Sequence, residues 1–314
     1  MISAAIQEAR DALPHGSIVA LVTPFASNGS VDKSALRALI DFHIDNGTTG
    51  IAIAGTTGEC STLSNQEHRD LIVTAVEYGA GRVHIMAGVG ANSTSEALEL
   101  ARFASAAGAN SLLSVVPYYV KPTQEGLRRH FLAQADVSDA PLVVYNVPGR
   151  TVTDLSVETL ARLAEHPNIR GIKDASGDMT RAVEIREALP NDFALYSGDD
   201  FTSMPYMTLG GRGVISVVAN VAPDCVARLC HFIANGDIKD ALRLFIALQP
   251  LTRALFVETS PGPAKFAVSL LGLCEPTIRL PLVIPEGATM QVIDKCVREA
   301  GKSARLSARR RTND

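Results

Sequence analysis

The sequence predicts an α/β protein, a (β/α)8 TIM barrel with a C-terminal extension of three helices. Eight short apolar runs recur along the first 218 residues, and stretches with helical periodicity lie between them. The starts of successive runs are 20 to 33 residues apart, which leaves room for one crossover helix after each strand. A doubly wound open sheet is the alternative, but no Gly-x-Gly-x-x-Gly motif follows the first run.

Each apolar run predicts a strand that is covered on both faces, because the runs are rich in β-branched residues and do not alternate with polar ones. The runs occupy residues 17–22, 50–54, 83–88, 111–116, 141–145, 169–173, 193–197 and 213–218. Between them, segments such as 33–46 and 94–107 repeat apolar side chains at helical spacing. Strand and helix therefore alternate through eight units, and the barrel is expected to span residues 17–236.

Segments outside these eight units complete the predicted organisation. Helical patterns at 237–256, 263–273 and 287–300 predict a C-terminal helical region over 237–301, packed outside the barrel because no Gly/Ser-rich linker sets it apart. Residues 1–16 are expected to form a short N-terminal extension outside the core. Residues 302–314 carry four arginines, and we expect them to form a disordered basic tail.

The composition excludes several classes of protein. Of the 314 residues, 46% are hydrophobic and 20% charged, and the net charge of -4 provides no basic surface for nucleic acid. No apolar run approaches the roughly 20 residues of a membrane-spanning helix, and the N-terminus lacks the apolar core of a signal peptide. Five scattered cysteines without a Cys-x-x-Cys pair predict neither disulfides nor a zinc site. We therefore expect a cytoplasmic protein with no membrane partner.

Polar residues gather where the predicted strands end, which is where a TIM barrel builds its active site. The segments are 55–59 (GTTGE), 117–119 (PYY), 145–150 (YNVPGR), 173–174 (KD), 197–200 (SGDD) and 215–216 (IS). No His-x-His pair or close acidic cluster stands among them, so no metal ion or other cofactor is expected. The Asp199-Asp200 pair is the nearest candidate, and we expect it to cap the helix that follows.

Lys173 closes the sixth apolar run, so its amine would lie at the mouth of the barrel. Partial desolvation there favours the neutral amine, which attacks ketones. On position alone, a lysine that extends to solvent is the more common alternative. Tyr145 ends the neighbouring strand, and Thr56, Thr57 and Tyr119 stand on nearby loops, so hydroxyls that can pass protons to a carbinolamine converge on this lysine.

Two kinds of group near the same strand ends can bind carboxylates. Arg150 follows a Pro-Gly turn after the fifth strand, where its guanidinium can hold a carboxylate in bidentate fashion, although a surface arginine is the default. Glycines at 55, 58, 149 and 198 leave backbone N–H groups accessible to a carboxylate, or serve only the turns in which they stand.

Taken together, these segments resemble the pyruvate-dependent class I aldolase family, over about residues 17–300. The resemblance implies that Lys173 forms a Schiff base with pyruvate, and that the resulting enamine attacks an aldehyde. The nearest members use L-aspartate 4-semialdehyde, in lysine and diaminopimelate synthesis. It also implies a homotetramer built from two tight dimers. The implied proton relay is Thr56, Tyr145 and Tyr119, the last reaching a neighbouring subunit's site, and the implied substrate-binding residues are Thr57, Arg150, Gly198 and Ile215.

The same resemblance implies an allosteric site for L-lysine. Its residues would be His68, Asn92, Glu96 and Tyr118, whose side chains suit an amino acid. Without the family, all four are typical of ordinary loops and helix starts. Two nearby positions depart from the pattern of lysine-sensitive members, with Asn65 in place of a histidine and Cys60 in place of a serine.

Three alternatives to this activity stay open. Residues 258–265 (ETSPGPAK) depart from the Asn-Pro-Ile-Pro-Val-Lys type of segment, so a sibling aldolase or lyase acting on a longer 2-keto acid, such as a keto-deoxy sugar acid or N-acetylneuraminate, is the first. A barrel that has lost catalysis is disfavoured because the lysine, both tyrosines and the threonine are present. A barrel for sugar phosphates is disfavoured because the Gly-Gly-Arg-Gly segment at 210–213 precedes the eighth strand instead of following it.

Overall fold

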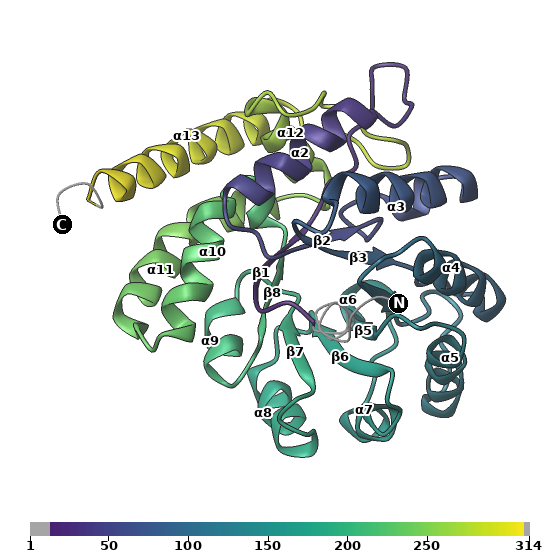
Figure 1. Ribbon diagram of the computed structural model, residues 1–314. Coiled ribbons are helices and arrows are strands. Elements are labelled where there is room, and N and C mark those ends of the chain that lie inside the picture. Colours follow the sequence, from purple (N-terminus) through teal and green to yellow (C-terminus); the bar gives the residue numbers. More distant parts are fainter. Residues whose placement is uncertain (1–12, 311–314) are drawn as a thin grey trace.

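The computed structural model of the protein describes residues 13–310, and eight parallel strands close into a barrel within them (Figure 1). Each strand pairs with the next along the chain, and the eighth pairs with the first. The predicted TIM barrel is therefore confirmed. The strands are β1 (Gly16–Ala20), β2 (Gly50–Ile53), β3 (His84–Gly88), β4 (Ser111–Val115), β5 (Leu142–Asn146), β6 (Ile169–Asp174), β7 (Ala194–Ser197) and β8 (Gly213–Ser216).

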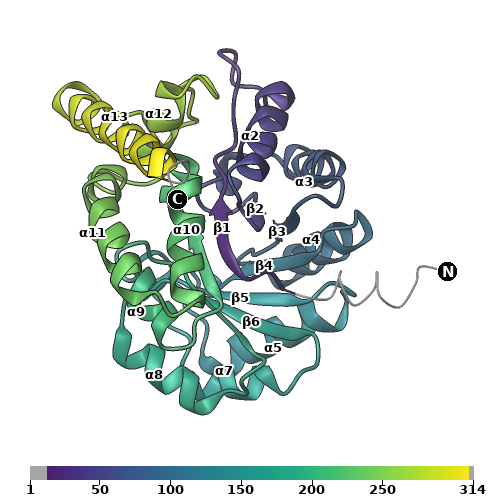
Figure 2. The ribbon, with the colours of Figure 1, turned by 60° about the vertical axis from the view of Figure 1, so that its left-hand side comes forward.

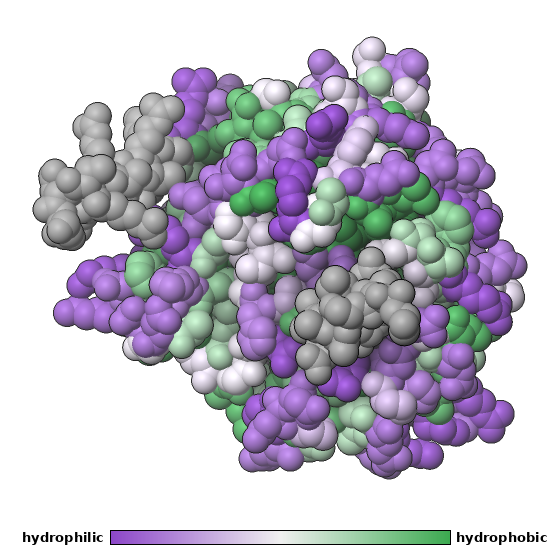
Figure 3. Space-filling view, in the orientation of Figure 1, coloured by the Kyte–Doolittle hydropathy of each residue, from purple (hydrophilic) through white to green (hydrophobic). Residues whose placement is uncertain are grey.

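Helices surround this barrel on its outside, as Figure 1 shows. One helix follows each strand: α2 (Lys33–Asp45), α3 (Asn65–Gly79), α4 (Thr94–Ala106), α5 (Gln124–Asp136), α7 (Val157–Ala164), α8 (Met179–Ala188), α9 (Ser203–Thr208) and α10 (Pro223–Ala234). Three short turns of helix lie at strand ends: η1 (Cys60–Thr62), α6 (Pro148–Thr151) and η2 (Val218–Asn220). Hydrophilic residues cover much of the outer surface, with smaller groups of hydrophobic residues between them (Figure 3).

Capping residues in the sequence explain where several helices begin. Asp32 accepts hydrogen bonds from the first backbone N–H groups of α2, and Asp178 does the same for α8. Ser64 and Glu67 form a reciprocal capping box at the start of α3. These short polar residues satisfy N–H groups that have no partner inside a helix, which fixes the entry of each crossover into its helix.

The apolar side chains form two layers, one inside the barrel and one between the strands and the helices. Along β1, Ile18 and Ala20 belong to the inner layer, whereas Val19 and Leu21 belong to the outer one. Successive side chains of a strand point to opposite faces, so a strand covered on both faces is apolar at consecutive positions. The continuous apolar runs of the sequence arise from this burial.

The first described residues correct one expectation about the N-terminus. Leu13 is 4% exposed and packs in the inner apolar layer. The hydroxyl of Tyr196 donates a hydrogen bond to the carbonyl of Pro14 over 2.6 Å. Residues 13–16 therefore belong to the barrel, closing its N-terminal end, and were wrongly placed in an extension outside the core. The rest of that predicted extension lies outside the described residues.

The C-terminal helices are α11 (Ile238–Leu255), α12 (Gly262–Leu270) and α13 (Gly287–Arg310). They pack against one another and, through α11, against α10, on one side of the barrel (Figure 2). Helix α13 continues to Arg310 and so occupies much of the segment for which a disordered tail was expected; residues 311–314 lie outside the described part. Within residues 13–310, no helix has the length and apolar character that crossing a membrane requires.

Candidate active site

Lys173 and Tyr145 lie side by side at the C-terminal end of the barrel. They are partners in the register of β5 and β6, and the Nζ of Lys173 is 4.1 Å from the centroid of the Tyr145 ring. Both are buried, at 6% and 7% exposed. Gly198, at the end of β7, comes so close that a Cβ there would be 3.0 Å from the Cε of Lys173 and 2.8 Å from Ala175. A glycine at 198 therefore makes room for the lysine.

A network next to Lys173 neutralises the nearest carboxylate. Asp174 is 2% exposed and accepts a 3.0 Å hydrogen bond from the Nε of Arg181, which also donates to the carbonyl of Leu155. Asp174 also accepts the backbone N–H of Ser176. Among the residues that the structure describes, no carboxylate forms an ion pair with Lys173, so its amine is left without a fixed partner.

The loop after β2 brings Thr56 and Thr57 to the same end of the barrel. Thr57 is buried, and the hydroxyl of Thr23 donates a 2.6 Å hydrogen bond to the carbonyl of Gly58, which holds the loop against β1. A Cβ on Gly58 would lie 3.1 Å from the carbonyl oxygen of Leu21, a tight contact that a larger residue could make only by shifting the backbone. The loop is therefore packed, and it presents its hydroxyls from a rigid frame.

A cavity of about 320 Å³ opens at this end of the barrel and is lined in part by Thr56, Arg150 and Tyr118. Its other lining residues are Cys60, Ser61, Gly90, Val115, Val147, Thr151, Ser260, Pro261, Pro281 and Leu282. Lys173 and Tyr145 are not among them and lie deeper in the barrel mouth. A larger cavity, of about 600 Å³, opens at the opposite end and contains none of the predicted site residues. TIM barrels carry their chemistry at the C-terminal ends of the strands, so the smaller cavity is the candidate active site.

Arg150 stands on α6, the single helical turn that follows β5. Pro148 begins this turn, where its missing N–H costs nothing. The Nη2 of Arg150 donates a 3.3 Å hydrogen bond to the carbonyl of Ser260, which precedes α12. Arg150 also lines the cavity, and its guanidinium has further donors, so it can bind an anion while this contact orients it.

Tyr119 is the predicted site residue that the single chain does not bring to Lys173. It is 88% exposed, whereas its neighbour Tyr118 is 39% exposed. Its backbone has a φ of 73°, a left-handed conformation that non-glycine residues adopt rarely and often at functional sites. Ile215, in contrast, is 1% exposed and packs in the inner layer of the barrel.

A buried ion pair behind the Thr56–Thr57 loop was not predicted from the sequence. Lys265, in α12, and Glu59 are fully buried and form an ion pair, and the Nζ of Lys265 lies 4.1 Å from the centroid of the Phe25 ring. Burial lowers the pKa of Lys265, and the charge of Glu59 opposes this. The backbone N–H of Arg279 donates to the second oxygen of Glu59. The one available signal was a lysine within the apolar helical pattern of 263–273.

The four residues predicted to bind L-lysine lie near one another on α3, α4 and the loops after β3 and β4. The Nε2 of His68 is 2.7 Å from the carbonyl oxygen of Gly88. Burial lowers the pKa of His68, while this hydrogen bond and the charge of Glu96 raise it. Burial raises the pKa of Tyr118, as do Cys60 and Glu96, while the backbone of Asn92 lowers it. These contacts place His68, Glu96 and Tyr118 in one region, together with Cys60 and the backbone of Asn92.

Asp200 has a different role from the one expected. Its carboxylate accepts hydrogen bonds from the hydroxyl of Ser216 and from the backbone N–H groups of Val217 and Val218, and burial raises its pKa. It therefore caps the turn η2 after β8, and the expectation that it caps the following helix was wrong. Asp199 instead binds the N–H of Phe201 and the hydroxyl of Thr202.

The fold and the site together define a barrel enzyme of the lyase class. Residues 13–300 match the model of the dihydrodipicolinate synthetase family, and the chain belongs to this family. It is 53% identical over 285 residues to 4-hydroxy-tetrahydrodipicolinate synthase of Thiobacillus denitrificans, covering 91% of this chain and 96% of that protein.

Solved structures agree with this assignment. Dihydrodipicolinate synthase from Acinetobacter baumannii, in complex with pyruvate, has a TM-score of 0.90 and 45% identity, covering 92% of this chain and 99% of that one. The enzyme from Cyanidioschyzon merolae, with lysine bound, has a TM-score of 0.88 and 40% identity, covering 91% of this chain and 98% of that one.

Proposed function

We propose that the protein catalyses the 4-hydroxy-tetrahydrodipicolinate synthase reaction, the condensation of pyruvate with L-aspartate 4-semialdehyde in lysine and diaminopimelate synthesis. The observation that carries this proposal is a buried lysine without an ion-pair partner among the described residues, stacked on Tyr145 at the C-terminal end of a barrel of this family. An amine in that position can capture a keto acid, because it is desolvated and no described carboxylate holds it.

The chemistry follows from the amine of Lys173. Its nitrogen attacks the keto carbon of pyruvate, and loss of water gives a Schiff base. Loss of a methyl proton then gives an enamine, whose carbon attacks the aldehyde of the second substrate. The semialdehyde's amino group displaces Lys173 from the imine carbon, so the product cyclises and the lysine is regenerated. Tyr145, Thr56 and Tyr119 carry the protons between these steps.

The substrates' carboxylates have separate binders in this proposal. Thr57 and the backbone near Gly198 and Ile215 hold pyruvate next to Lys173, since all of them lie at strand ends around it. Arg150 lies in the outer cavity and binds the carboxylate of the semialdehyde. A charged, bidentate contact fixes the aldehyde's orientation for attack by the enamine.

A steady-state assay tests the activity. Purified protein receives pyruvate with a panel of aldehydes, and a reductase for the cyclic product reports turnover. Turnover with L-aspartate 4-semialdehyde well above that with other aldehydes is the expected result. Turnover only in the cleavage direction, on N-acetylneuraminate or a keto-deoxy sugar acid, would instead identify a sibling lyase.

The oligomer in this proposal is a homotetramer, a dimer of tight dimers in which Tyr119 completes the neighbouring subunit's relay. The exposure and left-handed backbone of Tyr119 in the single chain support this. Activity should fall on dilution as the protein dissociates, and Tyr119→Phe should lose most of its turnover at full assembly. A fully active monomer, seen by sedimentation at assay concentration, would contradict the shared site.

The proposed regulator is free L-lysine, bound by His68, Asn92, Glu96 and Tyr118. Support comes from their proximity and from the relative whose structure has lysine bound. Calorimetry with and without pyruvate measures the coupling, which must be reciprocal for binding. Glu96→Ala should abolish inhibition and spare turnover. No heat and no inhibition at millimolar lysine would refute this site.

We also place the protein in the cytoplasm, on its composition and scattered cysteines.

A further inference from the structure

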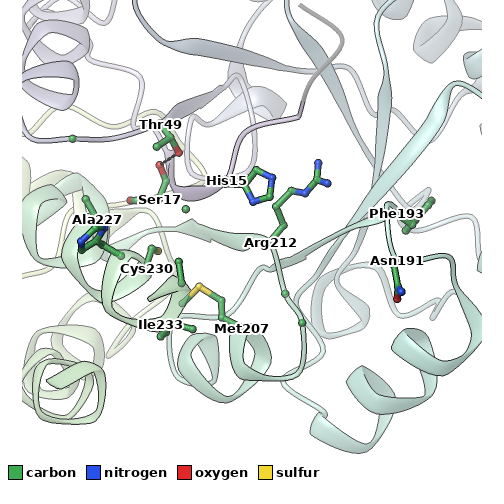
Figure 4. A pocket seen from close by; sticks show the side chains of 16 residues that line it. His15, Ser17, Thr49, Asn191, Phe193, Met207, Arg212, Ala227, Cys230 and Ile233 are labelled. Carbon is green, nitrogen blue, oxygen red and sulfur yellow. Dashed lines mark hydrogen bonds between the residues drawn. The ribbon is translucent and has the colours of Figure 1, made fainter. Parts of the chain in front are cut away.

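A second open cavity lies at the N-terminal end of the barrel, opposite the candidate active site. It measures about 600 Å³, within the range of small-molecule sites, and runs from the start of β1 and β8 to the last turns of α10. Figure 4 shows its polar groups, with His15 and Arg212 adjacent and Ser17 close to Thr49. No residue of the proposed reaction lines it.

A rigid turn supplies the cavity's arginine. The Gly-Gly-Arg-Gly segment at 210–213 leads into β8, and the backbone N–H of Arg212 donates to the carbonyl of Leu195 over 2.7 Å. The carbonyl of Arg212 in turn accepts the N–H of Gly16 over 3.0 Å. A Cβ on Gly213 would lie 2.1 Å from the carbonyl oxygen of Gly16, so only a glycine permits this close approach. The backbone of Arg212 is thus fixed between β1 and β7.

The guanidinium of Arg212 has no described carboxylate as an ion-pair partner. Its Nη1 is 3.5 Å from the carbonyl oxygen of Leu13, and its side chain also forms a hydrogen bond with Tyr196, which leaves its other donors for a ligand. Among the described residues, the lining contains this arginine and two histidines but no Asp or Glu. Burial and the charge of Arg212 lower the pKa of His15. The described lining is therefore electropositive, which favours an anion.

A buried hydroxyl in the cavity lining lacks a partner among the described residues. Ser17 is 1% exposed, and its Oγ makes no hydrogen bond with any described residue. A buried hydroxyl without a partner costs about 1–3 kcal/mol, so such groups are usually satisfied by a ligand or water. Thr49 donates its own hydroxyl to the Ser17 carbonyl over 2.9 Å and can still accept a hydrogen bond.

Apolar side chains form the remaining wall. Met207, Cys230 and Ile233 lie together between the hydroxyls and the loop that carries Arg212 (Figure 4). Inorganic anions alone would leave this wall in contact with water. A ligand that satisfies every part of the cavity has one anionic group for Arg212 and an apolar body for these side chains.

We propose that this cavity is a second binding site, for a small organic carboxylate with an apolar body. Arg212 holds the carboxylate, Ser17 and Thr49 provide hydroxyls beside it, and the wall of Met207, Cys230 and Ile233 contacts the body. The proposal is independent of the reaction assigned to the other end of the barrel.

The experiment is calorimetry of the full-length enzyme with benzoate and, separately, with inorganic phosphate. Saturating pyruvate occupies the active site during the titration. Arg212→Gln removes the charge, and Ala227→Leu fills the cavity from α10 without touching Arg212. Arg170→Gln is the matched control, because Arg170 is an exposed arginine at the same end of the barrel, outside the cavity lining. Arg150→Gln serves as the control for binding at the active site.

Benzoate should bind saturably, with affinity reduced at least about tenfold by Arg212→Gln and by Ala227→Leu. The two control variants should bind it as the wild-type protein does, and a crystal structure should show its carboxylate on Arg212. No saturable binding to folded, active enzyme overturns the proposal. So does binding that Arg212→Gln and Ala227→Leu leave unchanged, or that Arg150→Gln abolishes. Binding of phosphate without benzoate overturns the need for an apolar body, and with it the proposed ligand class.

Discussion

Two lysines of this chain are buried in similar surroundings but have different partners. Lys173, at the end of β6, and Lys265, in α12, expose 6% and 0% of their surface. The Nζ of each lies 4.1 Å from the centroid of an aromatic ring, that of Tyr145 and that of Phe25. Lys265 forms an ion pair with the buried Glu59, whereas no described carboxylate pairs with Lys173.

This difference separates a lysine suited to chemistry from one suited to support. Both rings favour an ammonium through their π faces, but only Glu59 adds a full opposite charge in a low-dielectric site. The amine of Lys265 is held by a carboxylate, so it is not free to attack a substrate. No described carboxylate holds the amine of Lys173, so a keto acid can reach it. Glu59 also belongs to the loop of Thr56 and Thr57, so the supporting lysine holds part of the site.

The largest expected effect is the loss of chemistry on removing Lys173. Lys173→Ala should reduce kcat by at least about 10³-fold, because no other amine can form the Schiff base. Borohydride added with pyruvate should trap the wild-type protein, and peptide mass spectrometry should place the adduct on Lys173. An adduct on Lys265 or Lys121 would show that this lysine, and not Lys173, forms the Schiff base.

Removing the charge of Lys265 should lower the stability of the fold, without removing a group that reacts with substrate. Lys265→Met leaves Glu59 buried and unpaired, which should lower the free energy of unfolding by about 3–5 kcal/mol in a denaturant titration. The double variant with Glu59→Gln should recover much of this loss, because no uncompensated charge remains. Lys239→Met, at an exposed lysine of α11, is the control and should change stability by less than about 0.5 kcal/mol. Equal effects at 265 and 239 would show that the ion pair does not stabilise the fold.

Arg150, near the site of Lys173, also contacts the region of Lys265, because it binds the carbonyl of Ser260 at the start of the segment that leads to Lys265. Arg150→Ala should raise the KM for the aldehyde about 10- to 100-fold and lower turnover, since charged hydrogen bonds contribute about 1.5–3 kcal/mol. The KM for pyruvate should change little. Steady-state kinetics with each substrate varied separately measures both. A large rise for pyruvate with an unchanged aldehyde KM would assign Arg150 to the other substrate.

The sequence predicted the barrel and the proximity of Lys173 and Tyr145 for one physical reason. In a closed parallel sheet all strand ends meet on one rim, so recognising the strands is enough to place the residues that follow them. Contacts that do not follow from strand order were missed. Glu59 and Lys265 are 206 positions apart, and Asp200 caps a turn that follows a different strand.

Other differences have more local causes. Leu13 and Pro14 close the barrel, but four residues are too few to show a period. The continuation of α13 to Arg310 has a sequence basis, because alanine, arginine, leucine and lysine in 301–310 favour helix. The positive charge of that segment led to the prediction of a disordered tail, whereas its helix propensity favours the helix that is observed.

The smallest expected effect is a pH dependence of stability that arises at Glu67, close to the buried ion pair of Lys265 and Glu59. Arg279, whose backbone binds Glu59, forms an ion pair through its guanidinium with Glu67, and this hydrogen-bonded contact lowers the pKa of Glu67 to about 2. A carboxyl whose pKa is lower in the folded state stabilises the fold above its unfolded value near 4.5, and this stabilisation disappears as the pH falls toward 2.

Glu67→Gln should therefore lower the free energy of unfolding at pH 7 by about 1 kcal/mol, a small value because solvent screens this partly exposed pair. The difference between the variant and the wild-type protein should shrink between about pH 4.5 and pH 2. Denaturant titrations across this range measure it, with Glu184→Gln, at an exposed glutamate of α8, as the control. If the difference in free energy of unfolding between variant and wild type stays constant across this range, the contact of Arg279 with Glu67 does not depend on the charge of Glu67. The stabilising ion pairs around Lys265 would then not include Glu67.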